Sequence, residues 1–440
     1  MPADPATFSP GGFLIAAPSS GAGKTTLTLA LLRALKHVGL TVASGKSGPD
    51  YIDPRFHEAA SGTACINLDA WAMTPETLRS LARDRAQGQD LLLVEGAMGL
   101  FDGAANGKGS AADLASTLGL PVVLVVDCAK QAQSVAALVH GFRIFRDDVS
   151  VAGVLLNRVG SARHEAMLRQ ALAPQDIEVL GALPRSKDLV LPERHLGLVQ
   201  AGEHPDLERF LDGAARLCRD HVDLGRLQKI AASLGPQGTG KKHLPAPLGQ
   251  KVAVARDTAF AFSYPHLLET WRQDGAEISF FSPLADEAPA ADADAIYLPG
   301  GYPELQAGRL ARAERFKAGL KGAAEAGTLI YGECGGYMTL GTGLIDADGH
   351  RHEMLGLLPL VTSFQARKRH LGYRKLRPLA RLPWSCALSA HEFHYASIVS
   401  EGAAERLFAA EDAESNRLAD MGLRAGSVMG SYAHVIARAP

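Results

Sequence analysis

Cysteine is scarce in this chain of 440 residues, and its few copies are scattered. The five cysteines are Cys65, Cys128, Cys218, Cys334 and Cys386, and no two of them form a Cys-x-x-Cys pair. Without such pairs the sequence predicts neither a zinc site nor a disulfide framework, and it favours a reducing compartment. An excess of charge of one sign is also missing, because 45 basic residues stand against 47 acidic ones. We therefore expect no nucleic-acid partner.

Long apolar runs are absent too. Hydrophobic residues make up 47% of the chain, yet no uninterrupted stretch is long enough to span a membrane. The first residues, Met1-Pro-Ala-Asp-Pro5, lack the charged and apolar regions of a signal peptide. The sequence thus predicts a cytoplasmic protein that does not bind membranes, and its length suffices for two domains with a core each.

A glycine-rich loop lies near the N-terminus. Residues 13–17 have the composition of a buried strand, residues 18–26 read Pro-Ser-Ser-Gly-Ala-Gly-Lys-Thr-Thr, and an apolar-periodic helix is expected through about Val38. This order is typical of a P-loop, where successive backbone N–H groups hold phosphate oxygens at a helix N-terminus. Pro18 stands where the motif usually has its first glycine, so the loop is a variant. The predicted nucleotide-binding residues are Gly21, Ala22, Gly23, Lys24, Thr25 and Thr26, with the Thr25 hydroxyl also on Mg2+.

Acidic residues follow two predicted strands, at the edge where open parallel sheets bind ligands. Strand 91–95 ends in Glu95, and Asp102 lies on the glycine-rich loop beyond it. A second strand, near residues 41–44, is followed by a loop that carries Asp50 and Asp53. We expect Asp50 and Glu95 to serve the metal and phosphate site, whereas we interpret Asp53 as part of an exposed acidic turn.

Two further apolar strands, residues 122–127 and 151–157, extend the predicted parallel sheet. Asn157 ends the second of them and is predicted to contact the adenine edge of the nucleotide. The N-terminal half is therefore expected to be an α/β domain with a P-loop parallel sheet and flanking helices.

One cysteine lies at a sharp turn in the C-terminal half. Residues 329–333 have the composition of a buried strand, and the chain then passes through Cys334-Gly-Gly into a helix. Such an elbow presents a nucleophile, and the helix N-terminus is expected to lower the pKa of the thiol. Upstream, Gly300 and Gly301 could hold an oxyanion with their N–H groups, and downstream His434 could accept the thiol proton. A buried, unreactive cysteine is the alternative.

Cysteine elbow, glycine pair and late histidine, within one half of the chain, resemble a class I (triad-type) glutamine amidotransferase domain. The resemblance implies glutamine hydrolysis through a thioester on Cys334, with His434 as the base. It also implies an oxyanion hole, formed by Gly300, Gly301 and Gly335. Many members carry a glutamate two positions after the histidine, where this chain has Ile436. Either a Cys-His dyad operates or another carboxylate orients His434, and Glu392 is one candidate.

The N-terminal features resemble the dethiobiotin-synthetase-like branch of P-loop proteins, whose members phosphorylate a carboxylate. The partitioning ATPases are a structural alternative. They usually carry an additional lysine near the start of the loop, where this chain has Ser19. That difference favours carboxylate chemistry over a nucleotide-driven switch.

Taken whole, the chain resembles the cobyrinic acid or hydrogenobyrinic acid a,c-diamide synthases of cobalamin biosynthesis. The motifs that carry the resemblance are Gly48-Pro-Asp-Tyr-Ile-Asp53, Val94-Glu-Gly-Ala-Met-Gly-Leu-Phe-Asp-Gly103, Leu298-Pro-Gly-Gly-Tyr-Pro-Glu304, Leu371-Gly-Tyr-Arg374 and His391-Glu-Phe-His-Tyr395. The resemblance implies a carbon–nitrogen ligase that uses ATP, Mg2+ and glutamine to amidate the a and c acetates of a corrinoid through an acyl phosphate. It further implies substrate contacts from Asp50, Tyr51, Ile52 and Asp102, and a metal site of Thr25, Asp50 and Glu95. A homodimer is expected by analogy with dethiobiotin-synthetase-like proteins.

The predicted domains meet in a segment rich in glycine, proline and lysine. Residues 1–232 are assigned to the dethiobiotin-synthetase-like ATP-binding domain, residues 233–249 to a linker, and residues 250–440 to the class I glutamine amidotransferase domain. Two alternatives stay open. One is a related amidoligase, similar to cobyric acid synthases, that acts on another tetrapyrrole or corrinoid carboxylate. The other is a P-loop switch protein whose amidotransferase-like module only binds ligands.

Overall fold

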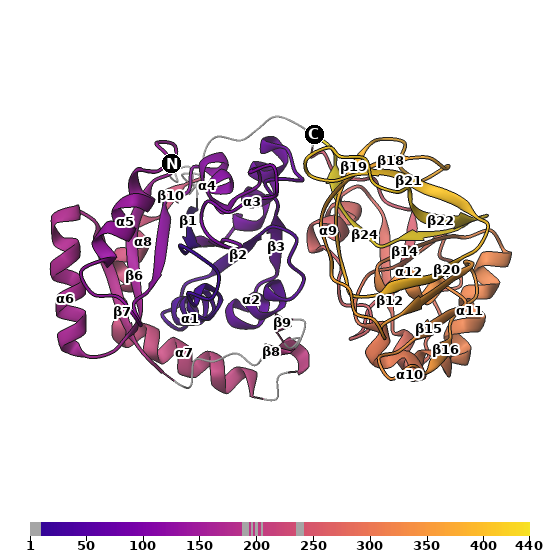
Figure 1. Cartoon of the computed structure of the whole chain (residues 1–440), viewed down its shortest axis with the longest axis horizontal. Coiled ribbons are helices and arrows are strands. Elements are labelled where there is room, and N and C mark those ends of the chain that lie inside the picture. Colours follow the sequence, from indigo (N-terminus) through magenta and orange to yellow (C-terminus); the bar gives the residue numbers. More distant parts are fainter. Residues whose placement is uncertain (1–9, 187–192, 195–196, 199–200, 204–205, 235–241) are drawn as a thin grey trace, which may run out of the picture. The chain divides into compact units, whose positions relative to one another are not determined.

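The computed structural model describes residues 10–186, 193–194, 197–198, 201–203, 206–234 and 242–440. The chain divides into two compact units, residues 1–242 and residues 243–440 (Figure 1). Part of the predicted linker, residues 235–241, lies outside the described residues. Within the part of the chain that is described, no helix combines the length and the apolar composition that a bilayer crossing requires.

The N-terminal unit is built on a parallel sheet with the strand order β3-β2-β4-β1-β5-β6-β7. A short strand, β10 (Ala232–Ser233), pairs antiparallel with the start of β1. The bounds of the main strands are β1 (Gly11–Ala16), β2 (Val42–Ser47), β3 (Cys65–Leu68), β4 (Leu91–Glu95), β5 (Val122–Asp127), β6 (Val151–Val159) and β7 (Glu178–Pro184). A small separate ribbon pairs β8 (Glu193–Arg194) with β9 (Gly197–Leu198).

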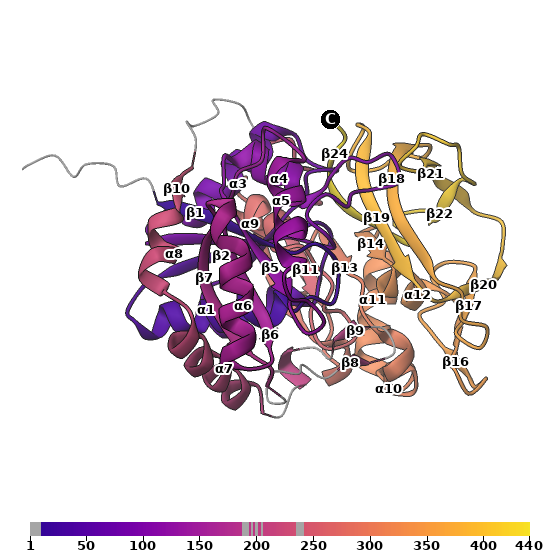
Figure 2. The ribbon, with the colours of Figure 1, turned by 60° about the vertical axis from the view of Figure 1, so that its left-hand side comes forward.

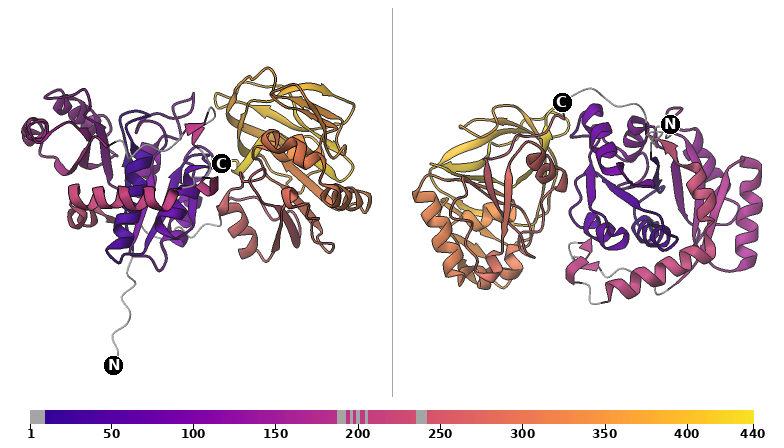
Figure 3. Two further views of the ribbon diagram at one scale, coloured as in Figure 1. Left: turned by 90° about the horizontal axis from the view of Figure 1, so that it is seen from below. Right: turned by 180° about the vertical axis from the view of Figure 1, so that it is seen from behind.

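Helices connect these strands because the chain must cross over between parallel neighbours. Their bounds are α1 (Lys24–His37), α2 (Asp53–Ser61), α3 (Pro75–Ala86), α4 (Ala111–Leu118), α5 (Val135–Ile144), α6 (Ala162–Leu172), α7 (Leu207–His221) and α8 (Leu224–Ile230). Helix α7 packs along α1 (Figure 3), and apolar side chains of both helices share one buried cluster with β1, β4 and β5. This packing holds α1 against one face of the sheet and so positions the glycine-rich loop that precedes α1.

The C-terminal unit has a mixed sheet with the order β12-β11-β13-β14-β23-β22-β21-β18-β19-β24. The strands from β12 to β23 are parallel, and those from β22 onward pair antiparallel. The bounds are β11 (Lys251–Ala255), β12 (Glu277–Phe281), β13 (Ala295–Leu298), β14 (Leu329–Glu333), β18 (His370–Pro378), β19 (Leu388–His394), β21 (Glu405–Glu411), β22 (Met421–Ala425), β23 (Val428–Ser431) and β24 (Ala433–Arg438). Figure 2 shows β18 and β19 as long adjacent strands.

Helices lie on both faces of the parallel part of this sheet. Trp271 of α9 (Pro265–Gln273) packs edge-on against Tyr297, with the ring centroids 5.9 Å apart, on one face. The opposite face is covered by α10 (Ala307–Ala311), α11 (Glu314–Glu325) and α12 (Gly335–Leu340). A smaller sheet, in the order β16-β15-β17-β20, consists of β15 (Gly343–Ile345), β16 (Arg351–Glu353), β17 (Leu360–Ser363) and β20 (Ser397–Glu401). The predicted fold class, two α/β domains with a P-loop sheet first, is confirmed.

Candidate active sites

The glycine-rich loop of the N-terminal unit turns directly into α1. Gly21 and Gly23 have φ angles of 81° and 93°, a left-handed conformation that favours glycine. A side chain at Gly23 would also collide with Asn157, whose Nδ2 lies 2.3 Å from the place of the missing Cβ. Asn157 Nδ2 donates to the Ala22 carbonyl at 2.8 Å, so its amide braces the loop from the end of β6. The N–H groups that open α1 are thus held ready for phosphate oxygens.

Lys24, the first residue of α1, is buried at the same turn. Its Nζ donates to the carbonyl oxygen of Met98 at 2.5 Å. Burial lowers the pKa of Lys24 below its ordinary value, while Glu95 opposes that shift. The loop that carries Met98 is tied to the P-loop, since the N–H of Leu100 donates to the carbonyl of Ala17 at 2.9 Å. Nucleotide phosphates would compete with one carbonyl for this ammonium group.

A fully buried carboxylate, Glu95, lies at the centre of the acidic edge. Its Oε1 accepts hydrogen bonds from Thr25 Oγ1 at 2.6 Å and from Lys46 Nζ at 2.8 Å. Its Oε2 lies 2.7 Å from His57 Nε2. Burial opposes ionisation of Glu95, but Lys46 and His57 outweigh it and hold the pKa of this carboxyl well below its usual value. The predicted meeting of Thr25 and Glu95 is therefore present in the structure.

Asp53 is not the exposed acidic turn that we expected, so that interpretation is wrong. It begins α2, and only 7% of it is exposed. Its Oδ2 accepts from Lys46 Nζ at 2.5 Å and lies 3.4 Å from Thr25 Oγ1. Burial, reinforced by Asp50, raises the pKa of Asp53 to about 7 against the opposing effect of Lys46. The physical reason for the error is Lys46, which supplies the charge that lets a second carboxylate lie beside Glu95.

Asp50 organises the loop that leads into α2. Its Oδ1 accepts from the N–H groups of Ile52 at 2.9 Å and of Asp53 at 3.0 Å, and its Oδ2 lies 3.8 Å from Lys46 Nζ. Asn67, on β3, donates to the Asp50 carbonyl at 2.6 Å. The predicted substrate loop is thus held at the same sheet edge as the acidic cluster.

Of the other predicted substrate residues, Tyr51 belongs to the same loop, whereas Asp102 lies on the loop after β4. Tyr51 is 9% exposed within the Asp50 loop. Asp102 Oδ2 accepts from the N–H of Gly99 at 3.0 Å and so closes the turn beyond β4. A side chain at Gly99 would come within 2.7 Å of the Pro18 carbonyl, which shows how closely this turn approaches the P-loop.

Lys46 and His57 are site residues that sequence reasoning missed. Lys46 had a usable signal, because it is the last residue but one of β2 and stands in register with Glu95 at the end of β4. A lysine in an otherwise apolar or small-residue strand, next to a strand that ends in glutamate, indicates a buried ion pair. His57 lies on α2 and gave no such signal, because it reaches Glu95 only through the packing of that helix against the sheet.

In the C-terminal unit, Cys334 sits at the turn between β14 and α12 with φ 47° and ψ −104°. A positive φ at a residue with a side chain is strained backbone, as expected for a nucleophile elbow. Its N–H donates to the Ser431 carbonyl at 2.8 Å, and only 2% of the residue is exposed. Close packing explains the glycines that follow, since a Cβ on Gly336 would lie 1.9 Å from the Leu298 carbonyl.

Gly300 marks the point where the predicted glutamine site comes together. The position of its missing Cβ lies 3.1 Å from His434 Nε2 and 3.2 Å from the Cβ of Cys334. The structure therefore brings nucleophile and predicted base to the same place. Similarly, the position of a Cβ on Gly335 lies 3.0 Å from the backbone nitrogen of Gly301. All three predicted oxyanion-hole glycines border the cysteine turn.

The thiol pKa differs from the sequence expectation. Burial, with a further contribution from the Glu304 carboxylate, raises the pKa of Cys334 above its ordinary value. The N–H of Gly335, which opens α12, does act to lower this pKa, but burial and the nearby carboxylates outweigh it, so the expected net lowering is wrong. Burial likewise lowers the pKa of His434 to about 3. The Sγ of Cys334 itself donates to the carbonyl oxygen of Phe393 at 3.7 Å.

Glu392, the carboxylate that we named as a candidate to orient His434, has other principal partners. It pairs with Arg374 at 2.7 Å and with His394 Nε2 at 2.8 Å. Burial opposes its ionisation, but His394 and Arg374 together lower the pKa of Glu392 to about 2. Its carboxylate is thus committed to a network on β18 and β19.

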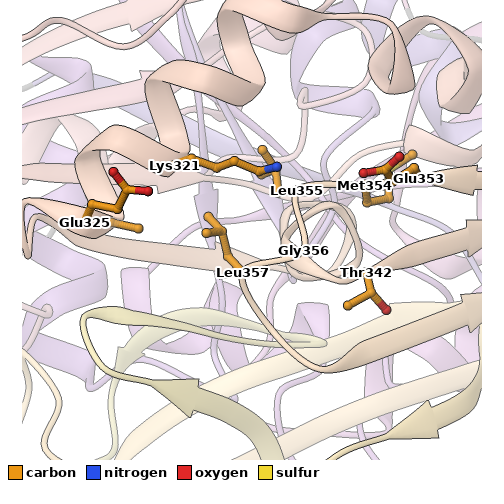
Figure 4. A pocket seen from close by; sticks show the side chains of 9 residues that line it. Lys321, Glu325, Thr342, Glu353, Met354, Leu355, Gly356 and Leu357 are labelled. Carbon is orange, nitrogen blue, oxygen red and sulfur yellow. The ribbon is translucent and has the colours of Figure 1, made fainter.

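A cavity of about 380 Å³ lies elsewhere in the C-terminal unit (Figure 4). Lys321 and Glu325 of α11 line one side, and the segment 353–357 lines the other. None of the predicted glutamine-site residues lines it, so it is not the predicted amidotransferase site.

Both units match known families. Residues 13–199 match the CobQ/CobB/MinD/ParA nucleotide binding domain, and residues 251–440 match the CobB/CobQ-like glutamine amidotransferase domain. A hydrogenobyrinate a,c-diamide synthase of Brucella anthropi is 63% identical over 428 residues, which cover 97% of this chain and 98% of that protein. Proteins of the same name from Rhizobium meliloti and Rhodobacter capsulatus are 58% and 52% identical, each over 97% of this chain and 99% of the relative.

Proposed function

The chain belongs to the hydrogenobyrinate a,c-diamide synthase family, and we propose that it amidates the a and c acetate carboxylates of hydrogenobyrinic or cobyrinic acid with ATP and glutamine. It is a glutamine-dependent carbon–nitrogen ligase of cobalamin biosynthesis. The observation that carries the finer proposal is the cluster of Thr25, Lys46 and Glu95 beside a P-loop.

The phosphoryl step follows from the charges in the N-terminal unit. A carboxylate resists attack by ammonia, so its oxygen first attacks the terminal phosphorus of ATP, the bond to ADP breaks, and an acyl phosphate forms. The negative charge that moves during this transfer needs fixed cations. Lys24 at the start of α1 and Lys46 at the end of β2 provide two of them at one edge of the sheet. Ammonia then attacks the acyl carbon and inorganic phosphate leaves.

The residues present also suit a magnesium ion. One hydroxyl, from Thr25, and two carboxylates, from Asp53 and Glu95, converge there, and Mg2+ prefers such oxygen ligands together with substrate phosphates. We propose that Thr25 and Glu95 would hold the ion, with Asp50 or Asp53 beside them. When bound, Mg2+ supplies charge neutralisation to the transferring phosphoryl group. Lys46 already neutralises part of this carboxylate charge in the protein itself.

The glutamine step is proposed for the C-terminal unit. His434 Nε2 accepts the Sγ proton of Cys334, and the sulfur bonds to the side-chain carbonyl carbon of glutamine. The N–H groups of Gly300, Gly301 and Gly335 are proposed to hold the resulting oxyanion. The carbon–nitrogen bond breaks as Nε2 returns the proton to the nitrogen, which releases ammonia and leaves a thioester. Water then adds to that carbon, its proton passes to Nε2, the carbon–sulfur bond breaks, and glutamate and the thiol are restored.

The corrinoid is proposed to contact the loop Asp50-Tyr51-Ile52 and Asp102. Both lie at the phosphate-binding edge, and their backbones are fixed by the hydrogen bonds of Asp50 and Asp102 described above. A rigid loop at this edge can bring one acetate arm toward the phosphate. The second amidation then requires the intermediate to shift or rebind with a fresh ATP and glutamine.

The direct test is product mass after incubation with MgATP, glutamine and either hydrogenobyrinic or cobyrinic acid. We expect two successive mass decreases, each matching the change of one carboxylate to an amide, and only with ATP. The faster substrate identifies the preferred corrinoid. Turnover of ATP with no mass change in either corrinoid would contradict the proposal and favour a switch protein. Amidation at other carboxylates would favour the cobyric acid synthase-like alternative.

A further inference from the structure

A second buried carboxylate lies on the far side of the predicted base. Glu333 ends β14, immediately before Cys334, and is 2% exposed. Its Oε2 lies 3.9 Å from His434 Nδ1. This is an ion-pair distance rather than a hydrogen bond, and catalytic contacts are often long before substrate binds.

Neighbouring groups hold this carboxylate in place. The N–H of Val435, the residue after the histidine, donates to Glu333 Oε1 at 3.0 Å. The hydroxyl of Tyr297 on β13 donates to Oε2 at 2.7 Å. Strand register contributes as well, since Glu333 of β14 pairs with Ser431 of β23, and β24 begins two residues later. The Glu333 carboxylate is therefore held by a backbone N–H of β24, the strand that carries His434.

The two ring nitrogens of His434 face different groups. Nε2 lies on the side of Gly300 and Cys334, as the close approach to the Gly300 Cβ position shows. Nδ1 lies on the side of Glu333. When Nε2 takes the thiol proton, the imidazole becomes a buried cation, and a buried cation needs a counter-charge. Ile436, where many class I domains have a glutamate, offers no charge.

We propose that Glu333 is the positioning residue that orients His434 and stabilises its protonated form, so the acidic member of the triad comes from the residue before the nucleophile. The inference rests on the proposed glutamine step. Burial raises the pKa of Glu333 to about 7. A positive charge on the neighbouring imidazole would favour the ionised carboxylate, so the two charges stabilise each other. Glu333 touches neither glutamine nor the sulfur in this role. It acts only through His434.

Three assays on Glu333→Gln test the proposal without requiring a corrinoid. They are glutamate release from glutamine, the Michaelis constant for glutamine, and the rate at which a diazo-ketone analogue of glutamine alkylates Cys334. We expect kcat for glutamate release and the alkylation rate to fall about a hundredfold with an unchanged Michaelis constant. In a separate control that does use the corrinoid, ATP-dependent amidation with ammonium in place of glutamine should keep its wild-type rate, since that reaction bypasses His434.

Glu392→Gln is the comparison variant, because Glu392 is the other buried carboxylate considered for this role. A large loss in Glu392→Gln with full activity in Glu333→Gln would overturn the proposal. Thermal unfolding shows whether each variant folds. If Glu333→Gln does not fold, Glu333→Asp retains the charge but shortens its reach, and we expect an intermediate kcat at an unchanged Michaelis constant. A folded Glu333→Asp with wild-type kcat would also overturn it. If Cys334→Ala loses alkylation while Glu333→Gln keeps it, this inference fails and the proposed glutamine step stands. If Cys334→Ala is still alkylated, the proposed glutamine step itself fails.

Discussion

Lys46 and Glu95 stand opposite each other in the parallel register of β2 and β4, and their side chains meet at 2.8 Å. Both are buried, and Asp53 joins the same ammonium group at 2.5 Å. One cation thus compensates two carboxylates at the phosphate-binding edge. The arrangement explains how a buried acidic cluster exists in the protein before any nucleotide arrives.

Replacing Lys46 by Met should remove the phosphoryl-transfer step while leaving glutamine hydrolysis intact. The change deletes a cation near the transferring phosphate, for which we expect about a hundredfold loss of kcat. It also leaves Asp53 without its counter-charge and Glu95 with His57 alone, at a cost of about 3–5 kcal/mol in the stability of the N-terminal unit. Ammonium-dependent amidation measures the first effect, and urea unfolding the second. Lys251→Met, which removes an exposed pair with Asp292, is the control and should change neither.

Replacing His57 by Gln should weaken the magnesium site. His57 fixes Glu95 Oε2 at 2.7 Å, and a carboxylate that loses its outer partner is less well oriented for a metal. We expect the Mg2+ concentration for half-maximal binding of ADP to rise about tenfold. Isothermal titration calorimetry measures this without turnover. His37→Gln, at the exposed end of α1, serves as the control, and equal Mg2+ dependence in the two variants would refute the role of His57.

The sequence was sufficient for the features set by local pattern. The P-loop, its preceding strand and its helix follow from residues 11–37, and the structure ends α1 at His37, one residue before the expected Val38. Glu95 at a strand end and Cys334 at an elbow were also predictable, because strand ends and sharp turns have short-range signals.

Features set by packing were not predictable in the same way. Asp53 is buried because Lys46, on another element, supplies its counter-charge. The pKa of the Cys334 thiol depends on burial, which arises only in the folded chain. Glu333 stands next to Cys334 in the sequence, yet its relation to His434 is a matter of sheet register between distant segments. Tertiary neighbours therefore decided the electrostatics of both sites.

Gly300→Ala should abolish glutamine use and spare the use of ammonium. The new methyl group would lie 2.2 Å from His434 Cε1, so either the base or the glycine loop must move. Because proton transfer depends on close alignment, we expect a loss of about a hundredfold or more in glutaminase kcat. Glutamate release measures it. Gly322→Ala is the matched control, since nothing lies within 4 Å of its Cβ position in α11, and it should raise stability by about 0.5–1 kcal/mol. Equal glutaminase rates in the two variants would contradict the close approach at Gly300.

Acidification should destabilise the C-terminal unit through a buried histidine on α9. His266 is fully buried, its Nε2 lies 3.0 Å from the Ile436 carbonyl, and burial lowers its pKa from 6.5 to about 4. Between these two pH values the unfolded chain binds a proton that the folded chain does not. Stability is therefore fully present above pH 6.5 and falls as the pH drops toward about 4, by about 3 kcal/mol for this group.

The same sign applies to His391 and His434, whose pKa values burial lowers to about 4 and about 3. Thermal denaturation at pH 7, 6 and 5 measures the stability of the C-terminal unit. We expect this stability to fall more steeply as the pH decreases. In His266→Gln, whose amide can still donate to the Ile436 carbonyl and does not titrate, the loss between pH 7 and pH 5 should be smaller. An identical pH dependence in that variant would contradict this prediction, because it would mean that His266 has the same pKa in the folded and the unfolded chain.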